Sequence, residues 1–240
     1  MAINIDTVYQ KVLVLANKEQ RGYITPQEFN LLADQAQLII FEQYFHDIDR
    51  YLELHGSSGE YSDKIDILHE KIAPFENFKV AMSAVSGNDL TLPTATAVHK
   101  LGTVFYAAGV FDVEVERVEK NELHYMERTA LAAPTDARPV YVRRTNSIIR
   151  LFPSSPTVSY STSNVTCNYV AKPSAPTWGY KVVNNEALHD STTATDFELH
   201  PSEESELVYK ILELAGIVLN KPGLVQVAAN EDNELMIKKQ

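Results

Sequence analysis

The sequence predicts an α+β protein in which a helical bundle, formed by the N- and C-terminal segments, carries an inserted antiparallel β-sheet or β-sandwich region. In residues 1–74 and 201–240, apolar side chains recur at the spacing of amphipathic helices. In residues 75–200, short runs rich in Val, Tyr and Phe are separated by Pro, Ser, Thr and Asn, which is typical of strands and turns. The 240 residues are 45% hydrophobic and 22% charged, which is enough apolar material for a core without disulfides or metals.

A long helix at residues 26–54 is the main element of the N-terminal region. Thr25 and Glu28 have the spacing of a capping box, and Pro26 suits the first helical position. No glycine and no further proline interrupts the segment before Gly56, which marks its end. At a rise of about 1.5 Å per residue the helix would be roughly 43 Å long, which is unusual in a globular domain.

Shorter helices are expected on either side of the β region. Apolar spacing predicts one at residues 7–18 and another at 63–72. Ser202 is a suitable N-cap for a helix at 203–219, and a weaker helical pattern follows at 224–238. Because the β region lies between these helical parts, we expect residues 201–240 to pack on the N-terminal helices as one bundle.

The β region contains a series of predicted strands and one short predicted helix at residues 119–129. Thr145–Ser147 separate two of the strands and favour a hairpin loop between them. The predicted strands are residues 89–92, 101–107, 111–118, 139–144, 148–152, 164–171 and 180–183.

The composition excludes several classes of protein. A net charge of −11 argues against a sequence-reading nucleic-acid-binding protein, because phosphate contacts require clustered Lys and Arg. The single cysteine, Cys167, excludes an intrachain disulfide. The first residues show no basic segment followed by an apolar run, and no apolar run reaches the length of about 18 residues that a membrane span needs. We therefore expect neither a secretory signal nor a membrane-spanning segment.

No catalytic motif indicates an enzyme. The G-x-S-x-G, P-loop, H-E-x-x-H, C-x-x-C and G-x-G-x-x-G patterns do not occur. Gly56–Gly59 favours a turn over a phosphate loop, since no Lys follows it. His46 with Asp47 and Asp49 is more typical of a solvated helix face than of a metal site, and Cys167 in a predicted strand favours a core position. We expect no catalytic residue, no cofactor and no metal.

Basic residues gather around one predicted hairpin. In an otherwise acidic chain they make it a candidate site of contact with a partner. An acidic partner surface, a phosphate group and an ordinary solvated sheet face all remain open as explanations. The residues are Arg138, Arg143, Arg144 and Arg150.

The long helix has more apolar surface than a monomer requires. On a helical wheel, two adjacent apolar faces cover well over half of its circumference, whereas a surface helix needs a stripe of about 100°. Either other helices of the same chain cover both faces, or a neighbouring subunit covers the second. The second face, our candidate subunit interface, consists of Leu31, Leu38, Phe41, Phe45, Ile48 and Leu52.

A series of short motifs along nearly the whole chain resembles head–tail connector proteins of tailed bacteriophages, the adaptor or tail tubular protein A-like ring components of the neck. The order of the motifs carries the resemblance. They are Lys18–Ala33, Gln35–Gln37, Phe41–Phe45, Leu90–Pro93, Arg138–Tyr141, Ile149–Pro153, Asn168–Pro173, Pro176–Gly179, Asp196–Pro201, Leu207–Leu212 and Ala215–Ile217.

The resemblance implies a non-enzymatic virion protein that forms a homo-oligomeric ring, commonly of twelve copies, at the head–tail junction. Its partners would be portal and tail proteins, and DNA would pass through the ring without being read. Such a protein resides in the virion and is found in the host cytoplasm during assembly, with no membrane and no small-molecule substrate. The alternatives are another tail component, such as a tail-hub, tail-tube or tail-completion protein, or a small hydrolase or carbohydrate-binding module on the β region.

Overall fold

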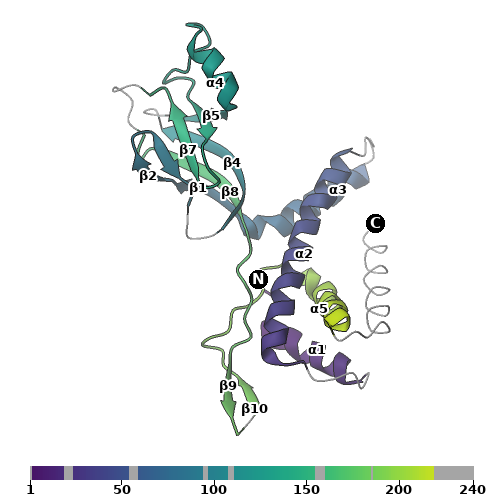
Figure 1. Cartoon of the computed structure of the whole chain (residues 1–240). Helices are drawn as coiled ribbons and strands as arrows, with labels where there is room; N and C mark the ends of the chain where they lie inside the picture. Colours follow the sequence, from purple (N-terminus) through teal and green to yellow (C-terminus); the bar gives the residue numbers. More distant parts are fainter. Residues whose placement is uncertain are drawn as a thin grey trace. The chain divides into compact units, whose positions relative to one another are not determined.

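The computed structural model describes residues 2–18, 24–53, 59–93, 97–107, 111–154, 160–184 and 186–218. This part of the chain is a mixed α+β structure with five α-helices, a large curled sheet of eight strands and a small sheet of two strands (Figure 1). The chain divides into two compact units. The helical unit comprises residues 1–74 and 173–240, and the sheet unit comprises residues 75–172.

Four α-helices belong to the helical unit: α1 (Ile5–Lys18), α2 (Pro26–Glu53), α3 (Gly59–Ile72) and α5 (Glu204–Val218). α2 begins with the predicted capping box, in which the Glu28 amide donates to Thr25 Oγ1 at 3.3 Å and the Thr25 amide donates to Glu28 Oε2 at 2.9 Å. Residue 54, the predicted last residue of this helix, and the predicted helix at 224–238 lie outside the described residues. Short 3₁₀ turns follow α3 (Ala73–Phe75) and precede α5 (Pro201–Glu203).

α5 and α3 both pack on α2, the longest of the described helices. α5 contacts both α1 and α2, and α3 contacts α2. An ion pair connects the end of α3 to the 3₁₀ turn before α5, since Lys71 Nζ lies 2.6 Å from Glu203 Oε1 and both side chains are largely buried. The core contains Val8, Val12, Phe29, Ala33, Ile40, Phe41, Leu207 and Ile211.

Residues 173–200, which we predicted within the β region, belong to the helical unit. Side chains of α2 bind their backbone: Asn30 Oδ1 accepts from the Trp178 amide at 2.8 Å, and Gln37 Nε2 donates to the Ser174 carbonyl at 2.8 Å. The hairpin of β9 (Tyr180–Val183) and β10 (Glu186–His189) extends from this segment. These polar contacts are non-local, so strand periodicity did not reveal them.

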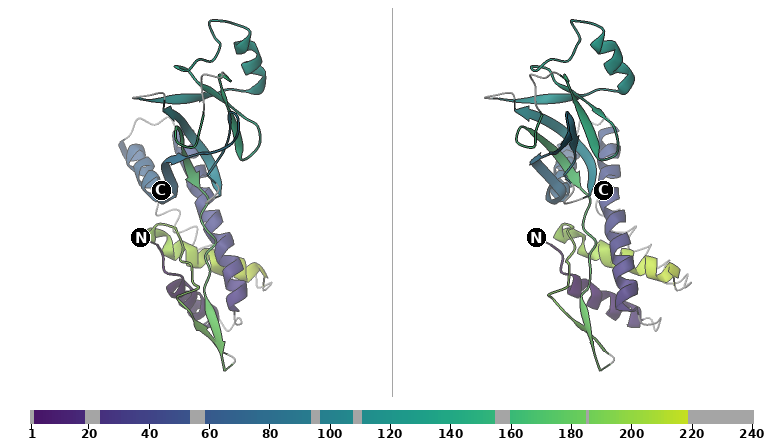
Figure 2. Two further views of the ribbon diagram at one scale, coloured as in Figure 1. Left: turned by 90° about the vertical axis from the view of Figure 1, so that its left-hand side faces the viewer. Right: turned by 60° about the vertical axis from the view of Figure 1, so that its left-hand side comes forward.

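The sheet unit contains β1 (Glu76–Ala81), β2 (Ser83–Ser86), β3 (Asp89–Thr91), β4 (Val98–Ala107), β5 (Asp112–Arg117), β6 (Val140–Arg143), β7 (Ile148–Phe152) and β8 (Val165–Ala171). Their order is β1-β8-β4-β5-β6-β7-β3-β2. The two edge strands, β1 and β2, are separated in sequence only by Met82, whose amide donates to the Val165 carbonyl. The sheet therefore curls until its edges meet, and Figure 2 shows this curl from two directions.

One pair of strands departs from the predicted antiparallel arrangement. β5 and β6 are parallel, because α4 (Lys120–Glu127) connects them as a crossover, whereas the other pairs are antiparallel. The predicted hairpin at residues 139–152 is confirmed as β6–β7. The interior of the curl is apolar and includes Met82, Leu90, Val104, Val115, Ile149, Leu151, Val165 and Cys167.

Candidate functional site

The candidate interface on α2 is only partly exposed. Leu31 is 74% exposed, whereas Phe41 is 1% exposed and its ring packs edge-to-face on Phe45 at a centroid distance of 5.1 Å. Phe41 is therefore a core residue of the single chain and is not available as the subunit contact for which it was a candidate; α3 and α5 both pack on α2. Partly buried positions are Leu38, Phe45 and Ile48, and the side chain of Leu52 lies outside the described part of the chain.

Both units expose further large apolar side chains that the sequence did not single out. In the helical unit they are Val14, Ile67, Val182, Val183 and Leu188. In the sheet unit they are Phe78, Val85, Phe111, Tyr125 and Leu131. Periodicity alone could not identify them, because exposure depends on which neighbours cover each element.

Asp89 neutralises two of the four arginines around the β6–β7 hairpin. Its carboxylate accepts from Arg144 Nη1 at 2.5 Å and from Arg150 Nε at 2.6 Å. The cross-strand pairings Asp89–Arg150 and Val142–Arg150 place these side chains on one face of the sheet. The hydrogen bonds from Arg150 and Arg144 hold the pKa of the Asp89 carboxyl below its ordinary value.

The other two arginines bind main-chain oxygens. Arg143 Nη2 donates to the Asn146 carbonyl at 2.7 Å and to its side-chain Oδ1 at 3.1 Å, which fixes the guanidinium over the hairpin loop. Arg138 Nη2 donates to the Leu131 carbonyl at 3.2 Å. The structure therefore brings Arg144 and Arg150 together through Asp89 and leaves Arg138 apart from them.

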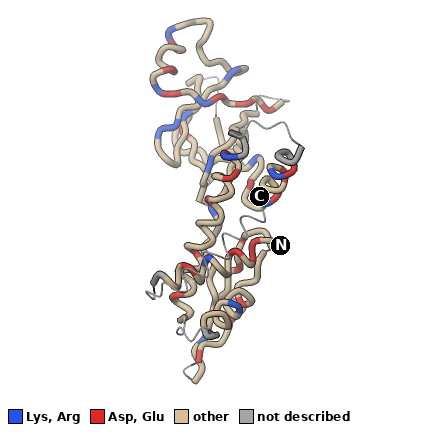
Figure 3. Tube along the Cα trace, turned by 90° about the vertical axis from the view of Figure 1, so that its right-hand side faces the viewer, with Lys and Arg blue, Asp and Glu red and all other residues tan. Residues whose placement is uncertain are grey.

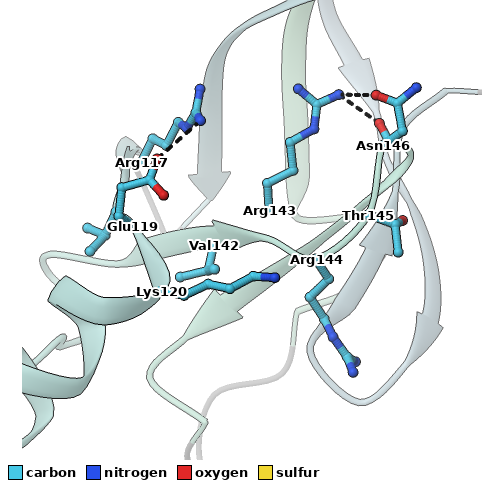
Figure 4. Close-up of a pocket in the computed structure, with 9 residues that line it drawn as sticks. Arg117, Glu119, Lys120, Val142, Arg143, Arg144, Thr145 and Asn146 are labelled. Carbon is cyan, nitrogen blue, oxygen red and sulfur yellow. Dashed lines mark hydrogen bonds and ion pairs between the residues drawn. The ribbon is translucent and has the colours of Figure 1, made fainter.

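A groove lies where the parallel strands β5 and β6 end. It has a volume of about 530 Å³ and is lined by Arg117, Val118, Glu119, Lys120, Val142, Arg143, Arg144, Thr145 and Asn146. Figure 4 shows the Lys120 side chain extending across Val142, while Arg143 turns toward Asn146. We call this the cationic groove, since four of its lining residues are cations and only Glu119 is an anion.

Arg117 and Lys120 of this groove were missed by sequence reasoning. Arg117 Nη2 lies 3.4 Å from Glu119 Oε1, and Lys120 forms no ion pair with any residue that the structure describes. They join the hairpin arginines because the α4 crossover places the ends of β5 and β6 side by side. A strand–helix–strand pattern at 111–144 was the available signal, but parallel pairing cannot be inferred from it alone.

Charge is divided unequally between the two units. Residues 75–172 contain ten Lys and Arg and nine Asp and Glu, a net charge of +1, whereas the remaining residues contain 11 Lys and Arg and 23 Asp and Glu, a net charge of −12. Figure 3 shows these charged residues along the chain. The net acidity of the protein thus comes from the helical unit, and the cationic groove lies on the other unit.

The described residues include a buried cysteine and no group of three or more potential metal ligands. Cys167 is buried in β8, and burial raises the pKa of its thiol to about 11. His46 Nδ1 is 3.8 Å from Asp47 Oδ1, and no group of three or more potential metal ligands occurs in the described ranges. None of the helices described combines the length and the apolar character needed to cross a lipid bilayer.

Comparison of the sequence with models of protein families and with curated proteins gave no match.

Proposed function

We propose that this chain is a structural protein of a tailed-bacteriophage virion and that it forms a homo-oligomeric ring at the head–tail junction. In this proposal the terminal segments form a helical bundle, and the sheet unit is inserted into it. The ordered motifs that resemble neck adaptor proteins support the proposal, as does the packing of α5 on α1 and α2. Portal and tail proteins would be its partners in the virion.

Exposed apolar side chains of the single chain are available for contacts between subunits. Leu31 on α2, Val182 on the β9–β10 hairpin and Phe111 before β5 are large apolar side chains that are mostly exposed. Burial of such side chains contributes about 1.5–3 kcal/mol each, so several together can supply much of the free energy of a subunit interface.

Passage of DNA through such a ring fits the charge of the helical unit. With a net charge of −12, that unit repels phosphate groups, so a channel lined by it would let a duplex slide without holding it. A strongly basic channel lining, seen in a map of the assembled ring, would contradict this part of the proposal.

Negative-stain electron microscopy of the purified full-length protein, alone and mixed with the portal protein of the same virus, tests the proposal. Rings with a central channel that dock on the portal are the expected result. Particles that dock elsewhere on the tail would instead indicate a tail-hub, tail-tube or tail-completion protein. Monodisperse single chains would contradict an assembly role.

A further inference from the structure

We propose that the cationic groove of one chain receives the acidic face of α3 from a second copy of the chain. The inference deepens the proposed function and rests on it, because a ring requires a repeated contact between two different surfaces of neighbouring copies. It names those two surfaces: the groove on the sheet unit and α3 on the helical unit.

The acidic face of α3 consists of three carboxylates around one exposed apolar side chain. Asp63, Asp66 and Glu70 are exposed, and Ile67 between them is 53% exposed. At 100° per residue these four positions fall within about 100° of the helix circumference. None of the three carboxylates forms an ion pair with another residue that the structure describes. This face is therefore free to bind a cationic partner.

The cationic groove has the complementary arrangement. Val118 and Val142, which belong to a small core cluster with Leu123 and Val140, lie at the floor of the groove and are only 5% and 6% exposed. Lys120, Arg117 and Arg143 stand around this floor, and Arg143 is already held in place by Asn146. In the proposed contact the three carboxylates face the cations, and Ile67 lies over the small exposed part of the two valines. Arginine forks bind carboxylates well, and a fixed guanidinium loses little conformational entropy.

A protein surface suits this groove better than nucleic acid does. Bases would require aromatic side chains for stacking, and the groove residues include none. The net charge of −11 on the whole chain also repels DNA at long range. The acidic helical unit of a second copy is the partner whose chemistry fits.

The contact is heterologous, since the groove and α3 are different surfaces. A heterologous contact leaves a free groove on one copy and a free α3 on the next, so copies add until the rotation between them closes a ring. Because the two surfaces differ, a charge-reversed groove on one copy can also be tested against a charge-reversed α3 on another copy.

Two charge-reversed full-length variants test the inference: Lys120→Glu in the groove and Asp66→Lys on α3. Both side chains are exposed and make no ion pair with a described residue, so both variants are expected to fold like the wild type by circular dichroism. Each variant alone should associate at least tenfold more weakly than the wild type by sedimentation velocity. A mixture of the two should recover association, because each groove then meets an α3 of opposite charge. Arg138→Glu, which makes the same charge change outside the groove, is the control and should assemble normally.

The outcomes separate this inference from the function on which it rests. If the wild type and both variants form equal rings, or if the mixture fails to recover, the groove–α3 contact is wrong while the ring remains. If the wild type never associates, the proposed function fails first. If Lys120→Glu assembles normally but loses measurable affinity for a 20-base-pair DNA duplex, the groove is a nucleic-acid contact and the inference is overturned.

Discussion

Asp89 joins strands that are far apart in sequence. It lies on β3 and binds Arg144 and Arg150, which are 55 and 61 residues away. We expect Asp89→Asn to lower the free energy of unfolding by about 1–2 kcal/mol, because two arginines lose a charged acceptor. Chemical denaturation of the wild type and the variant measures this difference in the free energy of unfolding. Asp112→Asn, at an exposed pair with Lys79, is the control and should cost less than about 1 kcal/mol; an equal loss in both variants would contradict the role of Asp89.

The same carboxylate makes stability depend on pH. The pKa of Asp89 is lower in the folded protein than in the unfolded chain, mainly because Arg150 donates to it. Its contribution is therefore present above the ordinary aspartate pKa of about 3.9 and is lost as the pH falls through the lowered value. The difference in the free energy of unfolding between wild type and Asp89→Asn should therefore shrink as the pH is lowered from about 5 to about 3, a range that spans the ordinary aspartate pKa. A difference that stays constant over this range would show that the carboxylate is not stabilised by its charge.

Tyr44 on α2 carries a buried hydroxyl that finds no hydrogen-bond partner among the described residues. Burial, followed by the nearby Glu203 and Glu206, raises the pKa of this phenol. We expect Tyr44→Phe to leave the stability unchanged or to raise it by up to about 1 kcal/mol, since an unpaired polar group is removed. Tyr9→Phe is the matched control and should be destabilising, because the Tyr9 hydroxyl donates to the Ile24 carbonyl at 3.4 Å. Thermal unfolding of both variants measures their stability relative to the wild type, and a large loss in Tyr44→Phe would contradict the unpaired hydroxyl.

At the scale of elements, α2 has two kinds of apolar position that respond differently to a charge. Leu31→Glu should weaken self-association without lowering stability, because Leu31 is exposed on the single chain. Phe41→Glu should instead unfold the helical unit, because it buries an unpaired charge at a cost of several kcal/mol. Gln35→Glu adds the same charge at an exposed position of α2 and is the control. Sedimentation and circular dichroism measure both effects, and normal association of Leu31→Glu would remove α2 from the interface.

The elements that could be predicted from the sequence are those fixed by local chemistry. The Thr25–Glu28 capping box, the β6–β7 hairpin and α4 depend on residues a few positions apart. The parallel pairing of β5 with β6 and the junction of the sheet edges at Met82 depend on segments that meet only in the folded chain. No local pattern encodes such pairings.

The candidate sites, too, could be predicted from the sequence only as far as they depend on nearby residues. Four arginines close together in sequence predicted a basic surface, but Asp89 forms ion pairs with two of them. Lys120 of the groove comes from α4, a helix that the sequence did not connect to the hairpin. On α2, helical periodicity predicted two apolar faces, yet only the packing of α3 and α5 decides which positions remain exposed.

For the whole molecule, the separation of charge predicts weak interaction with DNA. A chain of net charge −11, with −12 on one unit, should not retard duplex DNA in a gel at about 0.15 M salt. Lowering the salt to about 0.05 M is expected to change little, since few phosphate contacts form. Micromolar binding with a steep salt dependence would show that the cationic groove dominates over the acidic helical unit.

Ring assembly is the central claim, and native mass spectrometry of the full-length protein tests it most directly. The chain mass is 26.9 kDa. We predict one closed species at a single integer multiple of that mass, with twelve copies as the multiple that the neck adaptor resemblance implies. A protein that stays at the mass of one chain across concentration and salt, or that forms an open series of masses without a preferred size, would contradict the account.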